Sequence, residues 1–198
     1  MTEIKKGIVY MLKKKLQKGE WGYLEQSKKY TIVYTIVMFV VALSIFVLGY
    51  VLTGTKENIA SIIAVLVLLP ASRAMVSMIM HIKTPKYSHD VYETVASCAG
   101  NVPVLYQLYL TSYKKNFPLN CVAVKGNNLM CYTEFGNCDI KACEEHVDML
   151  LKQNRNKNVN IKIFTELKKF EERLGQLQTL DAVSQDEEVL QLMKNISL

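Results

Sequence analysis

No charged residue occurs in the 23-residue run from Tyr30 to Leu52, and the run from Ile59 to Ile82 contains one, Arg73. A helix that is apolar on every side has no face to present to water, so the first run excludes an ordinary surface helix. At about 1.5 Å per residue it is about 35 Å long, enough to cross the roughly 30 Å hydrocarbon layer of a membrane. Only the short polar segment 53–58 separates the two runs. We therefore expect a membrane α-helical hairpin of two transmembrane helices.

The part of the chain that follows this hairpin has no basic excess. The formal net charge is +6, of which residues 1–29 hold +5 because they contain eight lysines and three glutamates, and residues 83–198 sum to zero. A nucleic-acid-binding domain is expected to carry a basic surface, so nucleic acid is not the predicted partner. Lysines beside an apolar run instead favour anionic lipid headgroups. The residues predicted to contact the membrane are Lys13, Lys14, Lys15, Lys18, Trp21 and Arg73.

The first 20 residues have an apolar stripe with a spacing of four. It consists of Ile4, Ile8, Leu12 and Leu16, and lysines flank it. This pattern predicts a basic amphipathic helix that lies at the membrane surface. A solvated basic arm is the alternative interpretation.

The positions of the lysines also predict the orientation of the hairpin. Eight lysines precede the first run, and Lys83 and Lys86 follow the second, whereas the connecting turn contains only Lys56. The positive-inside rule then places both termini in the cytosol, in a multi-pass protein of the cell inner (plasma) membrane. All five cysteines follow the hairpin and no cleavable signal peptide precedes them, which fits reduced thiols in the cytosol.

Polar residues with a spacing of four occur in the second half of the second apolar run. Arg73, Ser77 and His81 are spaced by four and therefore share one face of a helix. A snorkelling arginine would explain Arg73 alone. The alternative is a polar membrane face that binds a lipid headgroup, pairs subunits or lines a pore. Ala60 and Ala64 are small enough to allow a homo-oligomer to form through this helix.

Residues 83–198 are predicted to form a small cytosolic α/β domain. The Gly126-Asn127 pair between two apolar runs predicts a β-hairpin turn. The expected order is αβββαβα with an extra C-terminal helix, which is typical of one mixed sheet covered by helices. The expected elements are a helix from Ser88 to Ala99, strands Val104–Thr111, Leu119–Val124 and Leu129–Thr133, a helix Asp139–Asn154, a strand Val159–Ile163, a helix capped by Thr165 that ends at Gly175, and a helix that begins with a Ser184–Glu187 capping box and runs to Ile196.

Over residues 88–165 this order of elements resembles the core of the restriction-endonuclease-like PD-(D/E)xK family. The resemblance implies an acidic residue at the start of the second strand and a Glu-x-Lys in the third, where the carboxylates hold a magnesium ion. Here the second strand begins Leu119-Asn120, and Glu134 is followed two residues later by Gly136 instead of lysine. Glu93 on the first helix is the only other matching acid. The metal site implied by the resemblance is therefore incomplete, which argues against catalysis.

Other signatures of chemistry are also missing. The chain has no C-x-x-C pair, no G-x-S-x-G elbow and neither of the glycine-rich phosphate loops. Cys143 and His146 share a helix face, but the cysteine spacing is irregular for structural zinc, so we expect buried cysteines and neither metal nor cofactor. His146 is the only histidine placed to serve as a base.

These observations leave three functions open. The leading prediction is a non-catalytic interaction or regulatory domain tethered to the membrane, with an unknown protein partner. The alternatives are an oligomeric membrane pore or effector gated by the cytosolic domain, and a membrane-anchored nuclease-like or other hydrolase. The predicted parts are a basic amphipathic segment at 1–29, the transmembrane hairpin at 30–82 and the α/β domain at 83–198.

Overall fold

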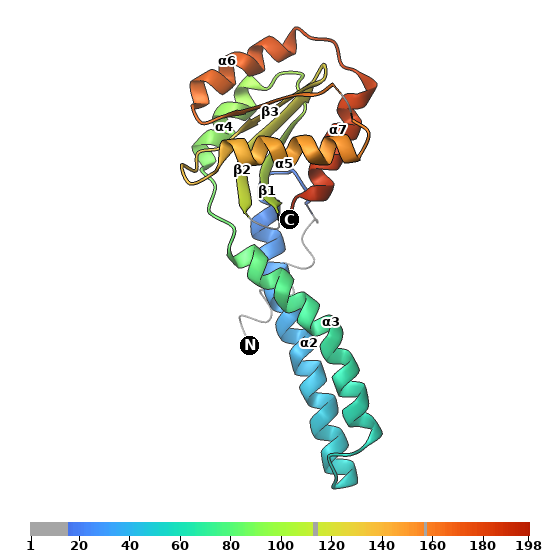
Figure 1. Ribbon diagram of the computed structural model, residues 1–198. Helices are drawn as coiled ribbons and strands as arrows, with labels where there is room; N and C mark the ends of the chain where they lie inside the picture. Colours follow the sequence, from blue (N-terminus) through green and yellow to red (C-terminus); the bar gives the residue numbers. More distant parts are fainter. Residues whose placement is uncertain (1–15, 113–114, 157) are drawn as a thin grey trace. The chain divides into compact units, whose positions relative to one another are not determined.

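The computed structural model describes residues 16–112, 115–156 and 158–198, which divide into two compact units (Figure 1). One unit contains residues 25–83, and the other contains residues 16–24 and 84–198. Lys13, Lys14 and Lys15, with most of the predicted amphipathic helix, lie outside the described residues. Residues 16–22 form turns instead of helix and belong to the α/β unit.

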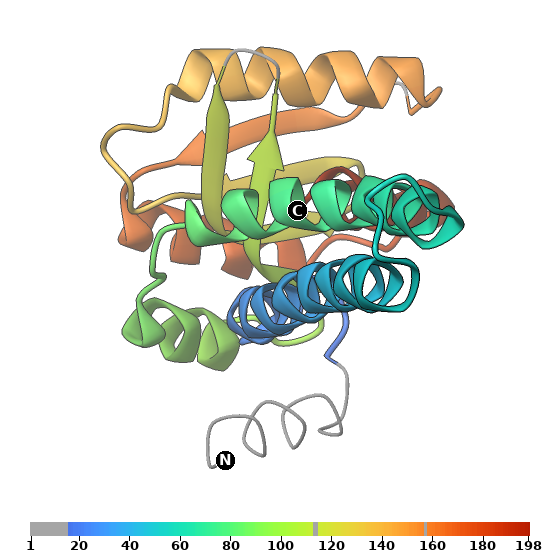
Figure 2. The same ribbon diagram turned by 90° about the horizontal axis from the view of Figure 1, so that it is seen from below.

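Two long apolar helices make up the first unit. Helix α2 spans Tyr23–Thr53 and helix α3 spans Ile59–Ile82, and the two lie side by side in Figures 1 and 2. Asn58 caps α3 by accepting a 2.9 Å hydrogen bond from the backbone N–H of Ser61. Both helices are long and apolar enough to span a membrane. In the apolar 18-residue stretch of each helix, 17% is buried within the structure.

Small residues line the contact between α2 and α3. Ala42 on α2 and Ala64 on α3 are buried, and a Cβ added to Gly49 would overlap the Cβ of Ala60. Such residues let two helix backbones approach closely. The Ala60–Ala64 pair, predicted to allow self-association, thus contributes to packing within the hairpin.

The second unit is built on one mixed four-stranded sheet. Strands β1 (Val104–Thr111), β2 (Asn116–Lys125) and β3 (Asn128–Tyr132) are antiparallel, and β4 (Asn160–Phe164) is parallel to β3, in the order β1-β2-β3-β4. Gly126 and Asn127 both have a φ of 60°, as a two-residue turn between antiparallel strands requires. The sequence-based prediction of a small α/β fold with a mixed sheet is confirmed.

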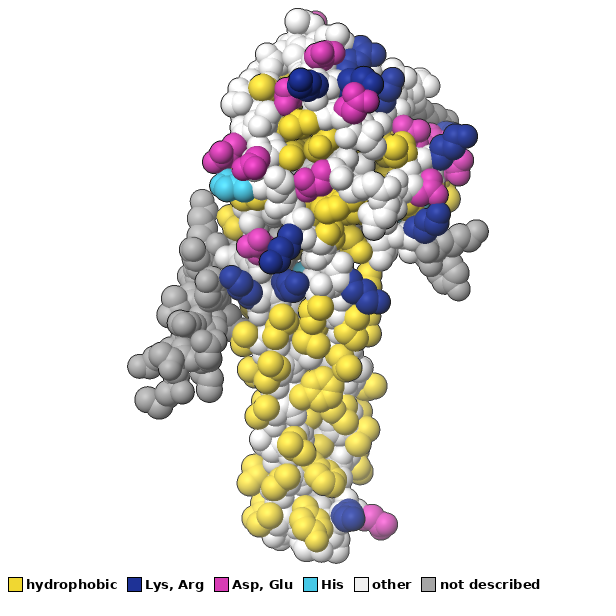
Figure 3. All heavy atoms as spheres, turned by 90° about the vertical axis from the view of Figure 1, so that its left-hand side faces the viewer, with side chains coloured by type: hydrophobic (Ala, Val, Ile, Leu, Met, Phe, Trp, Pro, Cys, Tyr) yellow, Lys and Arg dark blue, Asp and Glu magenta, His cyan; other side chains and the backbone are white. Residues whose placement is uncertain are grey.

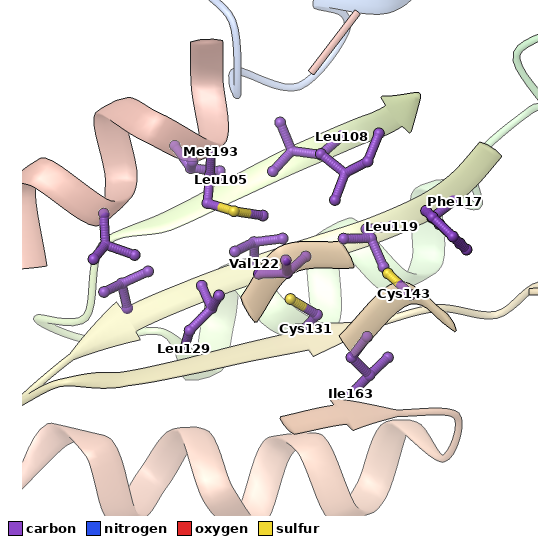
Figure 4. Packing of buried hydrophobic residues seen from close by; sticks show 14 of the residues in the cluster. Leu105, Leu108, Phe117, Leu119, Val122, Leu129, Cys131, Cys143, Ile163 and Met193 are labelled. Atoms are coloured by element: carbon purple, nitrogen blue, oxygen red, sulfur yellow. The ribbon is translucent and has the colours of Figure 1, made fainter. Parts of the chain in front are cut away.

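Helices cover both faces of this sheet (Figure 2). Helices α4 (His89–Cys98) and α6 (Leu167–Gln178) pack on one face, and α5 (Ile140–Gln153) and α7 (Ser184–Ile196) pack on the other. In Figure 4, side chains of the second face point toward Cys143 of α5 and Met193 of α7. The sheet therefore lies between two hydrophobic cores.

Two helix starts differ from the prediction. Glu166, rather than Thr165, is the N-cap of α6, which continues past Gly175. Val183 is the N-cap of α7, and Asp186 accepts a 2.8 Å hydrogen bond from its backbone N–H, so the predicted Ser184–Glu187 box is displaced by one residue. Asp186 takes this role because its carboxylate also binds the turn between β2 and β3.

Candidate functional site

The side-chain alternation of strand β1 reverses at Gln107. Leu105 and Leu108 both belong to the core beneath α5 and α7 (Figure 4), although residues three apart in a regular strand point to opposite faces. Gln107 between them has a φ of 54°, in the left-handed region that a residue with a side chain seldom adopts. The backbone is therefore strained at a buried position, since Gln107 is 4% exposed.

Strand β2 shows the matching reversal at Asn120. Leu119 and Val122 both lie in the core beneath α5 and α7, whereas Cys121 lies in the opposite core. Because β1 and β2 reverse at the same level, their pairing keeps one register on either side of Gln107 and Asn120. The irregularity therefore extends across two strands.

One connection between the two units is bound to β1 at this irregularity. We call residues 16–24 the strap. The N–H of Tyr106 donates a 2.8 Å hydrogen bond to the carbonyl of Gly19, and the N–H of Gly22 donates one of 2.8 Å to Oε1 of Gln107. A Cβ on Gly19 would lie 2.7 Å from Cδ2 of Leu105. The strap thus covers part of the free edge of β1, which would otherwise expose unpaired backbone groups.

Two predicted lipid-contact residues lie in the strap. The Nζ of Lys18 donates a 2.7 Å hydrogen bond to the carbonyl of Ser197, and burial lowers the pKa of Lys18. Trp21 stacks on Tyr92 and His89 of α4, with ring centroids 4.7 and 5.5 Å apart. Both residues therefore make contacts within the α/β unit.

The other connection, residues 84–88, is bound to the same part of β1. We call it the linker. The hydroxyl of Tyr87 donates a 3.1 Å hydrogen bond to the carbonyl of Leu108, and burial raises the pKa of this tyrosine. The ring of Tyr87 meets that of Phe135 edge-on at 5.4 Å. The strap and the linker are therefore bound to three consecutive residues, Tyr106, Gln107 and Leu108, which we call the joint.

Glu134 accepts hydrogen bonds from residues near the joint. Its Oε1 accepts hydrogen bonds from Nδ2 of Asn120 at 2.6 Å and from the N–H of Ser88, the N-cap of α4, at 3.1 Å. Glu93, the other nuclease-like candidate, lies 3.6 Å from His89 and is exposed. Among the described residues, no group of three His, Cys, Asp or Glu side chains could hold a metal ion.

Cys138 and Cys143 lie on either side of the start of α5. Asp139 is its N-cap, so the two thiols occupy positions that commonly form a hydrophobic contact at the start of a helix. A hydrogen bond from Cys143 lowers the pKa of Cys138 and raises that of Cys143.

His146, the predicted base, packs on Phe117 at 5.8 Å, and burial lowers its pKa.

The three residues of the predicted polar membrane face have different environments. His81 is 6% exposed, with Nε2 2.9 Å from Oγ of Ser27 on α2 and Nδ1 2.8 Å from the carbonyl of Ser77. The Arg73 side chain is exposed. His81 therefore contacts the other helix of the hairpin, whereas Arg73 lies on its outer surface.

A cavity of about 670 Å³ lies within the α/β unit beside the strap. Its lining includes Lys18, Lys125 and Lys194. Lys125 is 5% exposed, and its Nζ donates hydrogen bonds to Oδ1 of Asn101 at 3.0 Å and to the carbonyl of Gln178 at 3.1 Å. The sequence-based interpretation missed this cavity. The available signal was Lys125, which directly follows the apolar residues 121–124.

Comparisons with protein-family models, curated proteins and solved structures found no match to this chain. The resemblance to the restriction-endonuclease-like family therefore depends on the order of elements alone.

Proposed function

We propose that α2 and α3 insert into a membrane and tether the α/β unit to its cytosolic side as an interaction or regulatory domain. The exposure of the apolar side chains carries this proposal. In Figure 3 hydrophobic side chains cover most of the α2–α3 surface, and charged side chains lie toward its ends. Outside these helices, the exposed large apolar side chains of the described residues are Met149, Leu180 and Val183.

The free energy of hydration favours insertion. Burial of a large apolar side chain is worth about 1.5–3 kcal/mol relative to exposure in water. Exposed examples recur along both helices, among them Phe39, Val47, Leu66 and Val76. Lipid removes this cost without a protein partner, so a bilayer is the proposed environment of the hairpin.

The joint supports the tethering part of the proposal. The segments next to the hairpin in the sequence form hydrogen bonds to β1 within the α/β unit, through Gly22 and Tyr87. Attachment to a membrane raises the effective concentration of a domain toward partners on that surface. The proposed mechanism is this co-localisation, with Lys28 and Lys29 at the start of α2 and Lys83 and Lys86 after α3 in contact with anionic headgroups.

Two measurements test insertion and sidedness. The full chain should stay with the membrane pellet after alkaline carbonate extraction and leave it only in detergent. In intact cells, a membrane-impermeant maleimide should label Thr55→Cys in the α2–α3 turn but not the wild-type chain. The matched control Ser184→Cys, exposed in the α/β unit, should be labelled only after the membrane is permeabilised. Release by carbonate, or labelling of Ser184→Cys in intact cells, would contradict the proposal.

An oligomeric pore is the second candidate, and the exposed Arg73 is the observation that favours it. Arg73 lies in an otherwise apolar run, where a charge is costly unless it finds water or a partner. His81 and Ser77 contribute less to this candidate because His81 is bound within the hairpin. Liposome flux tests it, since an Arg73→Leu variant with unaltered flux would remove its support.

A further inference from the structure

The cavity beside the strap contains a buried lysine without an acidic partner. Both acceptors of Lys125, an amide oxygen of Asn101 and the carbonyl of Gln178, are neutral, and in the described part of the chain no carboxylate lies within ion-pair distance of its Nζ. Burial of an ammonium group is costly unless a negative charge compensates it. An ammonium has three N–H donors, and Lys125 uses two. The third has no acceptor among the residues that the structure describes.

Two further lysines line the same cavity. Lys18 is half-buried and donates to the neutral carbonyl of Ser197. Lys194 is also half-buried, and within the described ranges its side chain makes no hydrogen bond or ion pair. The first turn of α7, with Ser184, also borders the cavity, but it contains Asp186 and Glu187, which offset the partial positive charge of the helix N-terminus. The cavity thus gathers cationic groups from three separate segments.

Three acidic residues also line the cavity, namely Glu20, Asp186 and Glu187, so the formal charge of its lining is balanced. The carboxylate of Asp186 accepts hydrogen bonds from the backbone N–H groups of Gly126, Asn127 and Val183, at 2.8, 3.0 and 2.8 Å. Glu20 accepts a hydrogen bond from the N–H of Gln17, and both Glu20 and Glu187 are exposed to water, which screens their charge. The buried or half-buried charged groups of the lining are three lysines and one carboxylate, that of Asp186, so the less hydrated groups are positive on balance.

We propose that this cavity binds a phosphate-bearing molecule of about nucleotide size, with Lys18, Lys125 and Lys194 as the residues that contact its phosphates. Its volume of about 670 Å³ lies within the range of about 300–1,000 Å³ that is typical of small-molecule sites. Hydrogen bonds between ammonium groups and phosphate oxygens are among the strongest in proteins. Because Lys18 belongs to the strap, the ligand would also hold the strap against the sheet. The site does not depend on membrane insertion.

Titration calorimetry on the full chain in detergent tests this proposal with three ligands: pyrophosphate, ATP and glycerophosphoglycerol, a soluble lipid headgroup. At least one should bind saturably and with one site per chain. Stronger binding of ATP than of glycerophosphoglycerol would identify a soluble phosphorylated ligand, and the reverse order would identify a lipid headgroup. Absence of saturable binding by all three would overturn the proposal.

Variants then locate the binding site. Lys125→Met and Lys194→Met should each weaken binding about tenfold or more, whereas the matched control Lys168→Met, on the exposed surface of α6, should leave it unchanged. The Lys194 side chain makes no hydrogen bond or ion pair with the described residues, so its variant remains informative if Lys125→Met unfolds. Equal affinity in wild type and Lys194→Met would contradict the assignment.

Discussion

The backbone N–H of Gly22 donates a 2.8 Å hydrogen bond to Oε1 of Gln107, a residue 85 positions later in the chain with a φ of 54°. This bond joins the strap to the most irregular position of the sheet. The strained backbone of Gln107 thus coincides with a specific hydrogen bond of its side chain, to the N–H of Gly22.

Two replacements of Gln107 should distinguish the cost of its strained backbone from the loss of its hydrogen bond to Gly22. Gln107→Ala and Gln107→Gly both remove the bond to Gly22, but only glycine adopts a positive φ without steric cost. The glycine variant should therefore be more stable than the alanine variant by about 1 kcal/mol. Thermal unfolding measures this difference, and faster hydrogen exchange at the Gly22 amide in both variants measures the lost bond. Equal stability of the two variants would show that position 107 is not strained.

Asp186 should be a major stabilising residue of the α/β unit. It is 5% exposed, and its replacement by alanine removes the acceptor of three part-buried hydrogen bonds, from the N–H groups of Gly126, Asn127 and Val183. The expected loss is about 3 kcal/mol in the free energy of unfolding. Denaturant unfolding followed by circular dichroism measures it. The neighbouring exposed Glu187→Ala is the matched control and should have little effect.

The contact between Gly49 and Ala60 should determine how closely α2 and α3 pack. Gly49→Ala should destabilise the hairpin because the new methyl group would overlap the Cβ of Ala60. The second change Ala60→Gly removes that Cβ and should restore part of the stability, since Oδ1 of Asn58 also lies 2.9 Å from the added atom. Unfolding of the two single variants and the double variant in detergent gives the coupling. Strictly additive effects would exclude the contact.

His146 should titrate below the usual range of a histidine, because burial lowers its pKa. A folded-state pKa below the unfolded value means that the contribution to stability is complete above about pH 6.5 and is lost as the pH falls from there through the lowered folded-state pKa. Nuclear magnetic resonance of the imidazole protons measures the pKa directly. His146→Gln should lessen the loss of stability between neutral and mildly acidic pH, and His89→Gln, at an exposed histidine, is the control.

Local patterns in the sequence were sufficient to predict most of the elements. The Gly126-Asn127 turn formed as expected because two consecutive positive φ angles suit these residues. The apolar runs predicted two helices that are long enough to span a membrane. The start of α7 was displaced by one residue because Asp186 binds a turn about 60 residues away, which no local pattern contains.

The joint and the cavity could not be predicted in the same way. A polar residue at position 107 fits an ordinary alternating strand, so nothing in the sequence marks the reversal of alternation there. The cavity combines residues of the strap, the end of β2 and α7, which are brought together only by the tertiary fold. Lys18 was predicted to contact lipid from its place near the first apolar run, and its hydrogen bond to the carbonyl of Ser197 is a tertiary contact that the sequence does not show.

The stacking of Trp21 on His89 and Tyr92 has a practical consequence, because this chain contains a single tryptophan. Intrinsic fluorescence excited at the indole band reports on one place only, the strap against α4. A detached strap would lose both ring neighbours, and the emission would change in intensity and wavelength. The native chain thus carries its own optical sensor of strap attachment, without any added dye.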